Sequence, residues 1–363
     1  MMKKGIYIHI PFCQTKCPYC DFYSMRGTEK KKDLYLEALK KEILSYENIS
    51  ADTIYLGGGT PSVFGNERLK EIIELVKKKF SFNDGEITVE VNPSSCDEEL
   101  IKTLSSVGVN RISMGLQSAV DEERKFLGRH SDREKIEKSI ELCHRYGIEN
   151  ISLDVMLGVP EQTMESLRKT LDFVVNSGAK HISAYILKIE ENTLFYRRKN
   201  SLPLPDEDTV CDMYGFVCEY LENHGFNQYE ISNFSKENFE SRHNLKYWNS
   251  EEYLGLGTAA HSYLLGKRFY HERNFEEYLK NPSEYIPDGD GGSFEEYTML
   301  KLRLSTGLSK KEVAEKFGEE NFEKILSNSQ KFIRMKLMDS DGENLKFTRQ
   351  GFLLSNTILS EII

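Results

Sequence analysis

The sequence predicts an α/β fold in which six β-α units form one parallel sheet, closed or partly closed, with a smaller domain after it. Short apolar runs rich in Ile, Val and Tyr alternate with longer charged segments of helical spacing over the first 190 residues or so. The chain of 363 residues exceeds the usual length of one domain, and its pattern changes after Asn200. We therefore expect a large core domain and a second, smaller one.

The predicted strands are almost continuously apolar, as strands covered on both faces should be. The helices between them carry Glu, Lys and Leu at helical spacing, and Asn66, Asp97, Asp121 and Thr163 are suitable N-caps. We expect strands at residues 5–12, 53–58, 86–92, 111–117, 150–157 and 181–189, and helices at 33–48, 66–80, 97–107, 121–146 and 163–177.

Polar residues and glycines lie at the end of each predicted strand. In barrels of this kind the carboxyl ends of the strands form the active face. The alternative is that such residues only mark where a strand stops, but six consecutive strand ends share the feature. The residues at these ends include Cys13, Gly58, Gly59, Thr60, Glu90 and Gln117, with Lys188 and Glu190 closing the sixth strand, while Asp154 lies within the fifth strand.

The region after Asn200 predicts a helix at 206–223, a further strand at 227–234 and irregular segments at 241–248 and 253–263. A Pro/Gly/Asp stretch at 281–292 is the best candidate linker. Residues 294–363 read as three helices, a hairpin at 338–348 and a final helix, which is similar to a winged-helix domain. We expect three regions, at 1–230, 231–292 and 293–363.

Charge and hydropathy exclude several classes of partner. Lysine and arginine number 48 against 58 acids, a net charge of -10, which argues against nucleic acid and anionic membranes. Residues 291–363 carry 11 basic and 11 acidic side chains, so the winged-helix-like domain has no basic face for DNA. No apolar run approaches the 18 residues of a membrane span, and the N-terminus lacks a signal-peptide pattern. The expected location is cytoplasmic.

Three of the seven cysteines, Cys13, Cys17 and Cys20, lie within eight residues in the sequence CQTKCPYC. Three thiolates on one short loop can hold three irons of a [4Fe–4S] cluster and leave the fourth iron open to another ligand. Zinc is the competing metal, but a structural zinc site takes four N or S ligands. The dispersed cysteines, among them Cys211 and Cys218, are expected to be structural.

CQTKCPYC after a predicted strand, followed by GGGTPS at residues 57–62, closely resembles the radical S-adenosylmethionine superfamily. The resemblance implies a partial (β/α)6 TIM barrel of radical SAM type with a small, mostly helical, winged-helix-like C-terminal domain. It also implies that the open iron binds S-adenosylmethionine, with the glycine-rich strand end against the methionyl part. Glycine suits this place because a backbone without Cβ atoms lets a ligand approach closely.

Further motifs resemble the coproporphyrinogen-oxidase-like branch over essentially the whole chain: YIHIPFC at 7–13, EVNP at 90–93, GLQS at 115–118, LGRHS at 127–131 and LDVMLGVP at 153–160. Carboxylates suit ribose hydroxyls, and an arginine suits the methionine carboxylate. The S-adenosylmethionine contacts that the resemblance implies are Tyr7, Tyr19, Gly58, Gly59, Thr60, Glu90, Gln117, Arg129 and Asp154.

Within this branch, the oxygen-independent coproporphyrinogen III oxidases carry a fourth cysteine two residues after the third, and this chain has Phe22 there. YEISNFS at 229–235 and RHNLKYW at 242–248 resemble the HemW-type haem chaperones. Their HNxxYW motif makes His243 the candidate haem ligand, with Tyr247 and Trp248 beside the porphyrin. The resemblance thus assigns region 231–292 to haem.

We therefore expect a haem chaperone that holds a [4Fe–4S] cluster and S-adenosylmethionine and passes haem to haem-requiring proteins such as respiratory cytochromes. Transient contact with membrane proteins and a homodimer are compatible with the resemblance. One alternative is a radical SAM porphyrin-modifying enzyme, either a coproporphyrinogen III oxidase or a haem-ring-opening enzyme. A zinc-stabilised binding module without redox chemistry is another.

Overall fold

The computed structural model describes residues 3–129 and 133–363, so His130 and Ser131 of the LGRHS motif lie outside the described residues. Six parallel strands occur in sequence order at the centre of one sheet, and this confirms the predicted α/β fold. These strands are β1 (Lys4–Ile10), β2 (Ala51–Gly58), β3 (Glu86–Val91), β4 (Arg111–Gln117), β5 (Asn150–Leu157) and β6 (His181–Ile186).

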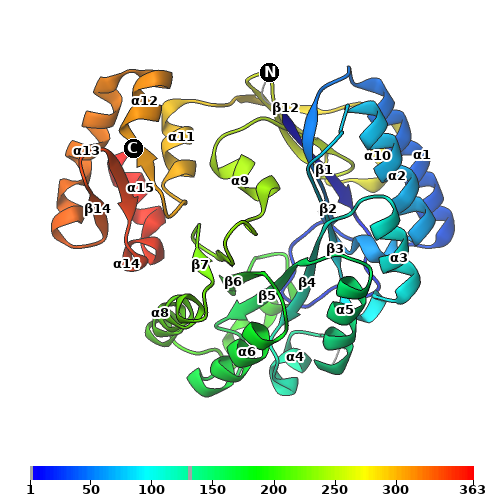
Figure 1. Cartoon of the computed structure of the whole chain (residues 1–363), viewed down its shortest axis with the longest axis horizontal. Coiled ribbons are helices and arrows are strands. Elements are labelled where there is room, and N and C mark those ends of the chain that lie inside the picture. Colours follow the sequence, from blue (N-terminus) through cyan, green and yellow to red (C-terminus); the bar gives the residue numbers. More distant parts are fainter. Residues whose placement is uncertain (1–2, 130–132) are drawn as a thin grey trace.

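The sheet curves around an inner space, and its helices cover the outer face (Figure 1). Inner and outer residues alternate along each strand, and the outer set packs with the helices into one continuous apolar core. The helices of this layer are α1 (Glu29–Ser45), α2 (Asn66–Lys79), α3 (Glu98–Ser106), α4 (Asp121–Phe126), α5 (Arg133–Arg145), α6 (Met164–Asn176) and α8 (Glu207–Asn223). The short α7 (Leu194–Arg198) instead lies beside the cysteine loop, where Phe195 N–H donates to the Pro18 carbonyl at 2.9 Å and its ring belongs to a separate small apolar cluster.

Most predicted boundaries hold within a few residues, but the helix expected at 121–146 is wrong. Helix α4 ends at Phe126, Gly128 has a φ of 66°, and α5 begins only at Arg133. Arg129 therefore lies in a loop and not on a helix. Asp97 and Thr163 are N-caps as expected, whereas the caps of α2 and α4 are the residues before Asn66 and Asp121.

Further strands extend both edges of the sheet, and the sequence indicated only those at one edge. The strand expected at 227–234 is a short pair, β7 (Asn227–Gln228) and β8 (Asn233–Ser235), and β8 pairs with β6. The segment at 253–263, expected to be irregular, contains β9 (Tyr253–Leu256) and the start of β10 (His261–Leu264). Strand β9 pairs in parallel with β1. The sheet then continues through β11 (Lys267–Tyr270) and β12 (Ile286–Asp290), so the 281–292 stretch includes an edge strand.

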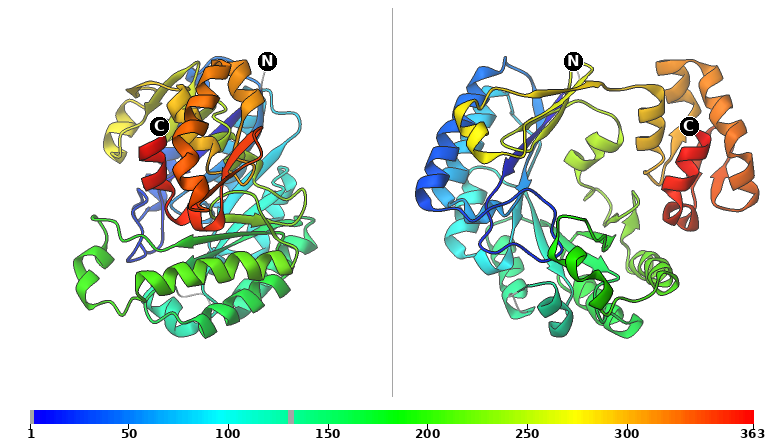
Figure 2. Two further views of the ribbon diagram at one scale, coloured as in Figure 1. Left: turned by 90° about the vertical axis from the view of Figure 1, so that its left-hand side faces the viewer. Right: turned by 180° about the vertical axis from the view of Figure 1, so that it is seen from behind.

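Two further helices complete this part of the chain, α9 (Arg242–Trp248) and α10 (Phe275–Lys280). Helix α9 lies in the opening of the curved sheet, between its inner face and the C-terminal domain, in both Figure 1 and Figure 2. The sheet is therefore an open barrel whose gap is occupied by α9.

The C-terminal domain has the expected winged-helix pattern of helices with a three-stranded sheet of order β13-β15-β14. Ile231 N–H donates to the Arg303 carbonyl at 3.1 Å, which joins this domain to the barrel edge. Its elements are α11 (Phe294–Lys301), β13 (Leu308–Ser309), α12 (Lys310–Phe317), α13 (Glu319–Arg334), β14 (Met338–Ser340), β15 (Asn344–Phe347), α14 (Arg349–Leu353) and α15 (Ser355–Ile362). None of the helices in the described ranges has the length and apolar character that crossing a bilayer requires.

Candidate functional site

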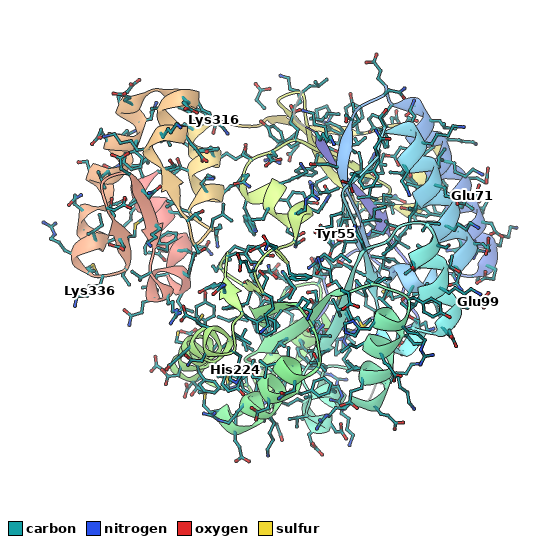
Figure 3. The ribbon with its side chains drawn as sticks, viewed as in Figure 1. Tyr55, Glu71, Glu99, His224, Lys316 and Lys336 are labelled. Atoms are coloured by element: carbon teal, nitrogen blue, oxygen red, sulfur yellow. The ribbon has the colours of Figure 1, made fainter. Side chains whose placement is uncertain are left out.

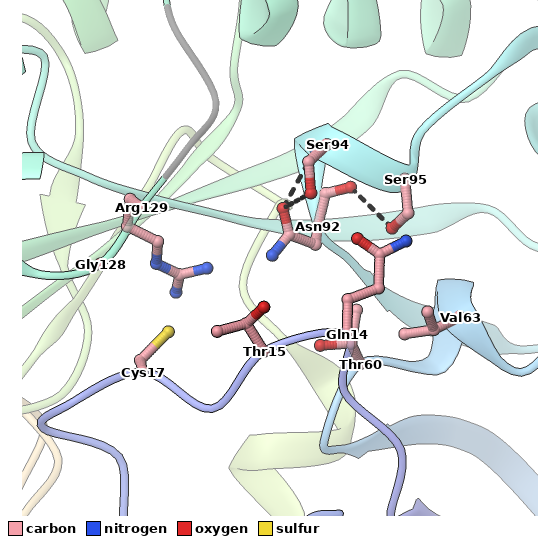
Figure 4. A pocket seen from close by; sticks show the side chains of 10 residues that line it. All are labelled: Gln14, Thr15, Cys17, Thr60, Val63, Asn92, Ser94, Ser95, Gly128 and Arg129. Carbon is pink, nitrogen blue, oxygen red and sulfur yellow. Dashed lines mark hydrogen bonds between the residues drawn. The ribbon is translucent and has the colours of Figure 1, made fainter. Parts of the chain in front are cut away.

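The three clustered cysteines lie on the loop between β1 and α1, and their half-buried thiols line one cavity of about 160 Å³. The Cys20 N–H donates to the Cys17 carbonyl at 3.2 Å, and the Cys13 N–H donates to the Met25 carbonyl at 3.0 Å. These bonds fold the loop back on itself. Figure 4 shows Cys17 and Thr15 of this loop facing the same space as Arg129 and Asn92.

The glycine-rich end of β2 packs directly under the cysteine loop. Gly59 N–H donates to the Ile10 carbonyl at 2.9 Å, and Thr60 N–H donates to the Phe12 carbonyl at 2.7 Å. The Thr60 hydroxyl lies 3.4 Å from Cys13 Sγ. A Cβ on Gly59 would come within 2.8 Å of these two carbonyl oxygens, so this approach of two backbones requires glycine.

Glu90 and Asp154 point into the same cavity from β3 and β5. Glu90 accepts hydrogen bonds from the Tyr55 hydroxyl at 2.8 Å and from the Gly58 N–H at 3.2 Å. Burial raises the pKa of Glu90 to about 7 and the pKa of Asp154 to about 6, despite these and other hydrogen bonds. Two carboxyls with pKa values close to neutrality suit hydrogen bonding to hydroxyl groups of a ligand.

Arg129 and Gln117 are fixed by two tyrosines. Arg129 donates from Nε and Nη2 to the Tyr19 hydroxyl at 3.2 and 3.0 Å. The Tyr185 hydroxyl donates to Gln117 Oε1 at 3.0 Å, and Gln117 has a left-handed φ of 68° at the end of β4. This rare backbone conformation places the amide at the cavity and is typical of functional positions.

Thirteen site residues are predicted from the sequence, and the structure brings eleven of them to this one cavity. They come from the cysteine loop, four strand ends and the loop after α4. The eleven are Cys13, Cys17, Tyr19, Cys20, Gly58, Gly59, Thr60, Glu90, Gln117, Arg129 and Asp154. The two that do not line it are Tyr7 and His243.

The donor set fits an iron–sulfur cluster better than a single metal ion. Ligands of one ion must converge, and no group of three His, Cys, Asp or Glu side chains within residues 3–129 and 133–363 does so. Thiolates that each bind a different iron of a cube need only face one cavity, as these three do. The arrangement therefore disfavours the zinc alternative.

A larger open cavity of about 880 Å³ continues from the first into the inner space of the sheet. The two share Tyr19, Cys20, Phe22, Glu90 and Asp154 among their linings. Figure 3 labels Tyr55, which lies on the inner face of β2, toward α9. The lining is rich in aromatic side chains, namely Tyr7, Tyr19, Phe22, Tyr23, Tyr55, Tyr185, Tyr247 and Tyr253.

His243 on α9 does not line either cavity. It is fully buried, its Nδ1 is hydrogen-bonded to the Thr53 hydroxyl at 2.8 Å, and its Nε2 is hydrogen-bonded to the Tyr247 hydroxyl at 2.8 Å. Burial lowers the pKa of His243 to about 3, so the imidazole is neutral. In this conformation both ring nitrogens are occupied, and Tyr247 separates the ring from the larger cavity.

Sequence reasoning missed Arg111, Ser113 and Tyr185, which also line the larger cavity. Arg111, Ser113 and Gly115 alternate along β4 and share its inner face. A signal for them was present, because a period of two in polarity within a buried strand indicates one face that is not packed in the core. Tyr185 carries no comparable sequence signal.

Comparison with known proteins identifies the family. The Radical SAM superfamily profile matches residues 7–174, and that of the HemN C-terminal domain matches residues 294–354. Heme chaperone HemW of Lactococcus lactis is 35% identical over 98% of this chain and 96% of its own length. Heme chaperone HemW of Bacillus subtilis is 35% identical over 99% of both chains.

The fold is also that of a solved structure. Coproporphyrinogen III oxidase (HemN) from Escherichia coli superposes with a TM-score of 0.86 over 99% of this chain and 90% of its own, at 21% identity. That likeness establishes the architecture, whereas the sequence similarity to the HemW proteins extends over nearly the full length at a higher identity. Membership of the radical SAM superfamily implies a [4Fe–4S] cluster and S-adenosylmethionine. The chain belongs to the HemW family of the radical SAM superfamily.

Proposed function

We propose that this protein is a cytoplasmic haem chaperone that binds haem and delivers it to haem-requiring proteins. The observation that carries the proposal is the near-full-length similarity to relatives named heme chaperone HemW. Phe22 adds support, because it stands where the oxidases have a fourth cysteine. Its side chain is 69% exposed and lines both cavities.

The smaller cavity is the proposed site of the cluster and S-adenosylmethionine. Cys13, Cys17 and Cys20 would ligate three irons, and a bound cluster with one open iron supplies a place to bind the amino and carboxylate groups of S-adenosylmethionine. Arg129 would pair with that carboxylate, while Glu90 and Asp154 would accept hydrogen bonds from the ribose. The remaining proposed contacts are Tyr19, Gly58, Gly59, Thr60 and Gln117 in this cavity, and Tyr7 in the adjoining larger cavity.

The larger cavity is the proposed haem site. Its volume of about 880 Å³ lies within the roughly 300–1,000 Å³ typical of pockets for small molecules and cofactors, and aromatic rings suit the faces of a porphyrin. Because this cavity is continuous with the smaller one, a ligand bound in one cavity would influence ligand binding in the other. These features support haem binding close to the cluster.

His243 is the proposed axial ligand. A neutral imidazole is the form that binds iron. Nε2 is held by the hydroxyl of Tyr247, and Tyr247 lines the larger cavity. Ligation through Nε2 would exchange that hydrogen bond for an iron bond and would move Tyr247 aside. Haem binding is therefore expected to shift α9.

The proposed recipients are haem proteins such as respiratory cytochromes, reached through transient contact with membrane proteins. A homodimer is compatible with this function. These partners rest on the family resemblance, and they are best identified by cross-linking the haem-loaded protein in membranes.

The test compares two assays on one anaerobically reconstituted sample. Haem titration should give a saturable Soret change. Incubation with coproporphyrinogen III, S-adenosylmethionine and a reductant should give no protoporphyrinogen, because Phe22 replaces the oxidase cysteine. Multiple turnover of coproporphyrinogen would favour the enzyme alternative, and failure to bind haem would refute the chaperone proposal.

A further inference from the structure

Arg111 is a buried cation on the inner face of the barrel whose guanidinium lacks hydrogen-bonded partners among the described residues. It is the first residue of β4, it is 2% exposed, and it lines the larger cavity. Its Nε is buried without a hydrogen bond, and no described residue forms a side-chain hydrogen bond or an ion pair with its guanidinium. A guanidinium with five donors in this state is uncommon in a folded protein.

Another buried arginine in the chain shows the usual arrangement. Arg124 is 3% exposed, forms an ion pair with Asp121 and donates from Nη1 to the Ser118 carbonyl at 2.9 Å. Burying a charge is costly unless it is paired and hydrogen-bonded, and Arg124 meets that requirement while Arg111 does not. Arg111 interacts electrostatically with Glu90 and Asp154 but without hydrogen bonds, so the free energy cost of burying it is only partly offset within the protein.

The acidic side chains around Arg111 are engaged elsewhere. Glu90 accepts from Tyr55 and Gly58, and Asp154 accepts from the Ser113 hydroxyl at 3.4 Å. Glu86 accepts the backbone N–H groups of residues 242 and 243 at 3.0 Å, which fixes the start of α9. Each nearby carboxylate therefore accepts its hydrogen bonds from groups other than Arg111, which acts on Glu90 and Asp154 through its charge alone.

We infer that Arg111 binds a carboxylate group of the ligand that occupies the larger cavity. The inference rests on the proposed function, because haem combines an apolar macrocycle with two propionate side chains. Aromatic rings would cover the macrocycle and Arg111 would bind one propionate. A guanidinium forms two parallel hydrogen bonds with a carboxylate, which is a strong and directional contact. The unpaired charge is the feature that this contact explains.

The inference is tested by a cycle of two ligands and two variants. Haem and haem dimethyl ester, in which both propionates are esterified, are titrated into the wild type, Arg111→Met and Arg111→Lys with the cluster reconstituted. We expect Arg111→Met to weaken haem binding by about 10- to 100-fold, as is usual for hydrogen bonds between charged groups. Binding of the ester should be weak in the wild type and almost unchanged in Arg111→Met. Lysine should retain part of the affinity as a point charge.

Thermal unfolding without haem supplies a second readout. Since Arg111 makes no hydrogen bond or ion pair with the described residues, Arg111→Met should keep or raise the Tm, as replacement of buried charges by apolar residues often does. The matched control Arg124→Met should lower the Tm and leave haem affinity within about twofold of the wild type.

Three results would overturn the inference: equal loss of haem and ester binding in Arg111→Met, equal binding of the two ligands by the wild type, or unfolding of Arg111→Met. A wild-type protein that binds neither ligand would instead refute the proposed haem function. The two failures are therefore distinguishable.

Discussion

The two ends of the connected cavities are built from different kinds of structure. At the cysteine end, most site residues lie in or just after the carboxyl-terminal halves of successive parallel strands, and the topology of the sheet brings these strand ends together. At the other end, α9 is a helix of seven residues that occupies the gap of the open barrel, held by side-chain contacts to β2 and β3. The cysteine end is open to a ligand as it stands, whereas the α9 end is closed around His243.

This difference separates two kinds of motif. A motif at strand ends gives the position of its residues directly, since the sheet determines where they lie. A motif on a short helix gives only the order of its residues, and packing decides which of them reach the cavity. Within HNxxYW, Tyr247 lines the larger cavity, while His243 is turned toward Thr53.

The largest effect expected is loss of the cluster in Cys17→Ala. Only three thiols serve the proposed cluster, so removing one should reduce iron and acid-labile sulfide to background after reconstitution and abolish S-adenosylmethionine binding. Haem binding at the α9 end should persist, because the proposed haem ligand His243 lies on α9 and not on the cysteine loop. Cys211→Ala removes an exposed thiol and is the matched control. Normal iron content in Cys17→Ala would disprove the cluster assignment.

The next effect concerns the α9 end. His243→Ala should weaken haem binding by about tenfold or more and change the Soret band, because it removes the proposed axial ligand. Cluster content should be unchanged. His261→Ala is the comparison variant, because the exposed imidazole of His261 lines the larger cavity and could ligate haem in place of His243. This imidazole stacks on Tyr270 with ring centroids 5.1 Å apart. A normal spectrum in His243→Ala together with an altered one in His261→Ala would transfer the ligand to His261.

The extent to which the site could be predicted follows the same division. The strand-end residues were predictable because polar residues recur at the ends of apolar runs, a pattern with a known geometric consequence. Arg129 was found by resemblance but was expected on a helix, since the Glu- and Lys-rich pattern continues past the Gly128 turn. The pairing of β9 with β1 joins segments almost 250 residues apart, and strands of four residues are too short to show a period. No local signal could have revealed it.

A third prediction contrasts how the two ends respond to pH. The raised pKa of Glu90, about 7, means that the folded protein binds this proton more tightly than the unfolded chain. Glu90 should therefore stabilise the fold as pH falls from 7 toward 4.5. His243 has a lowered pKa of about 3 and should do the opposite, destabilising the fold as pH falls below about 6.5.

Measurements of Tm between pH 8 and pH 5 check these signs in the protein without ligands. Relative to the wild type, Glu90→Gln should lose more stability on acidification and His243→Ala should lose less. Each group contributes at most about 1.4 kcal/mol per pH unit, and less for Glu90 because it is half-buried. Identical pH profiles for the wild type and both variants would contradict the assigned burial of these groups.

The smallest effect is expected for Trp248→Ala. Trp248 is the last residue of α9 and is half-buried, but it is absent from the described lining of either cavity. Tyr247 beside it lines the larger cavity and packs edge-to-face on Tyr253 with ring centroids 4.5 Å apart. Removing the indole should loosen the packing of α9 without touching the proposed haem ligand. Haem affinity should therefore fall by less than about fivefold, or about 1 kcal/mol of binding free energy. The Soret maximum should stay unchanged.

Tyr247→Phe is the sharper comparison, because it removes the hydrogen bond to His243 Nε2 and should make ligation of the haem iron easier. A loss in Trp248→Ala as large as that in His243→Ala would mean that haem binding turns α9 far enough to bring the indole onto the porphyrin.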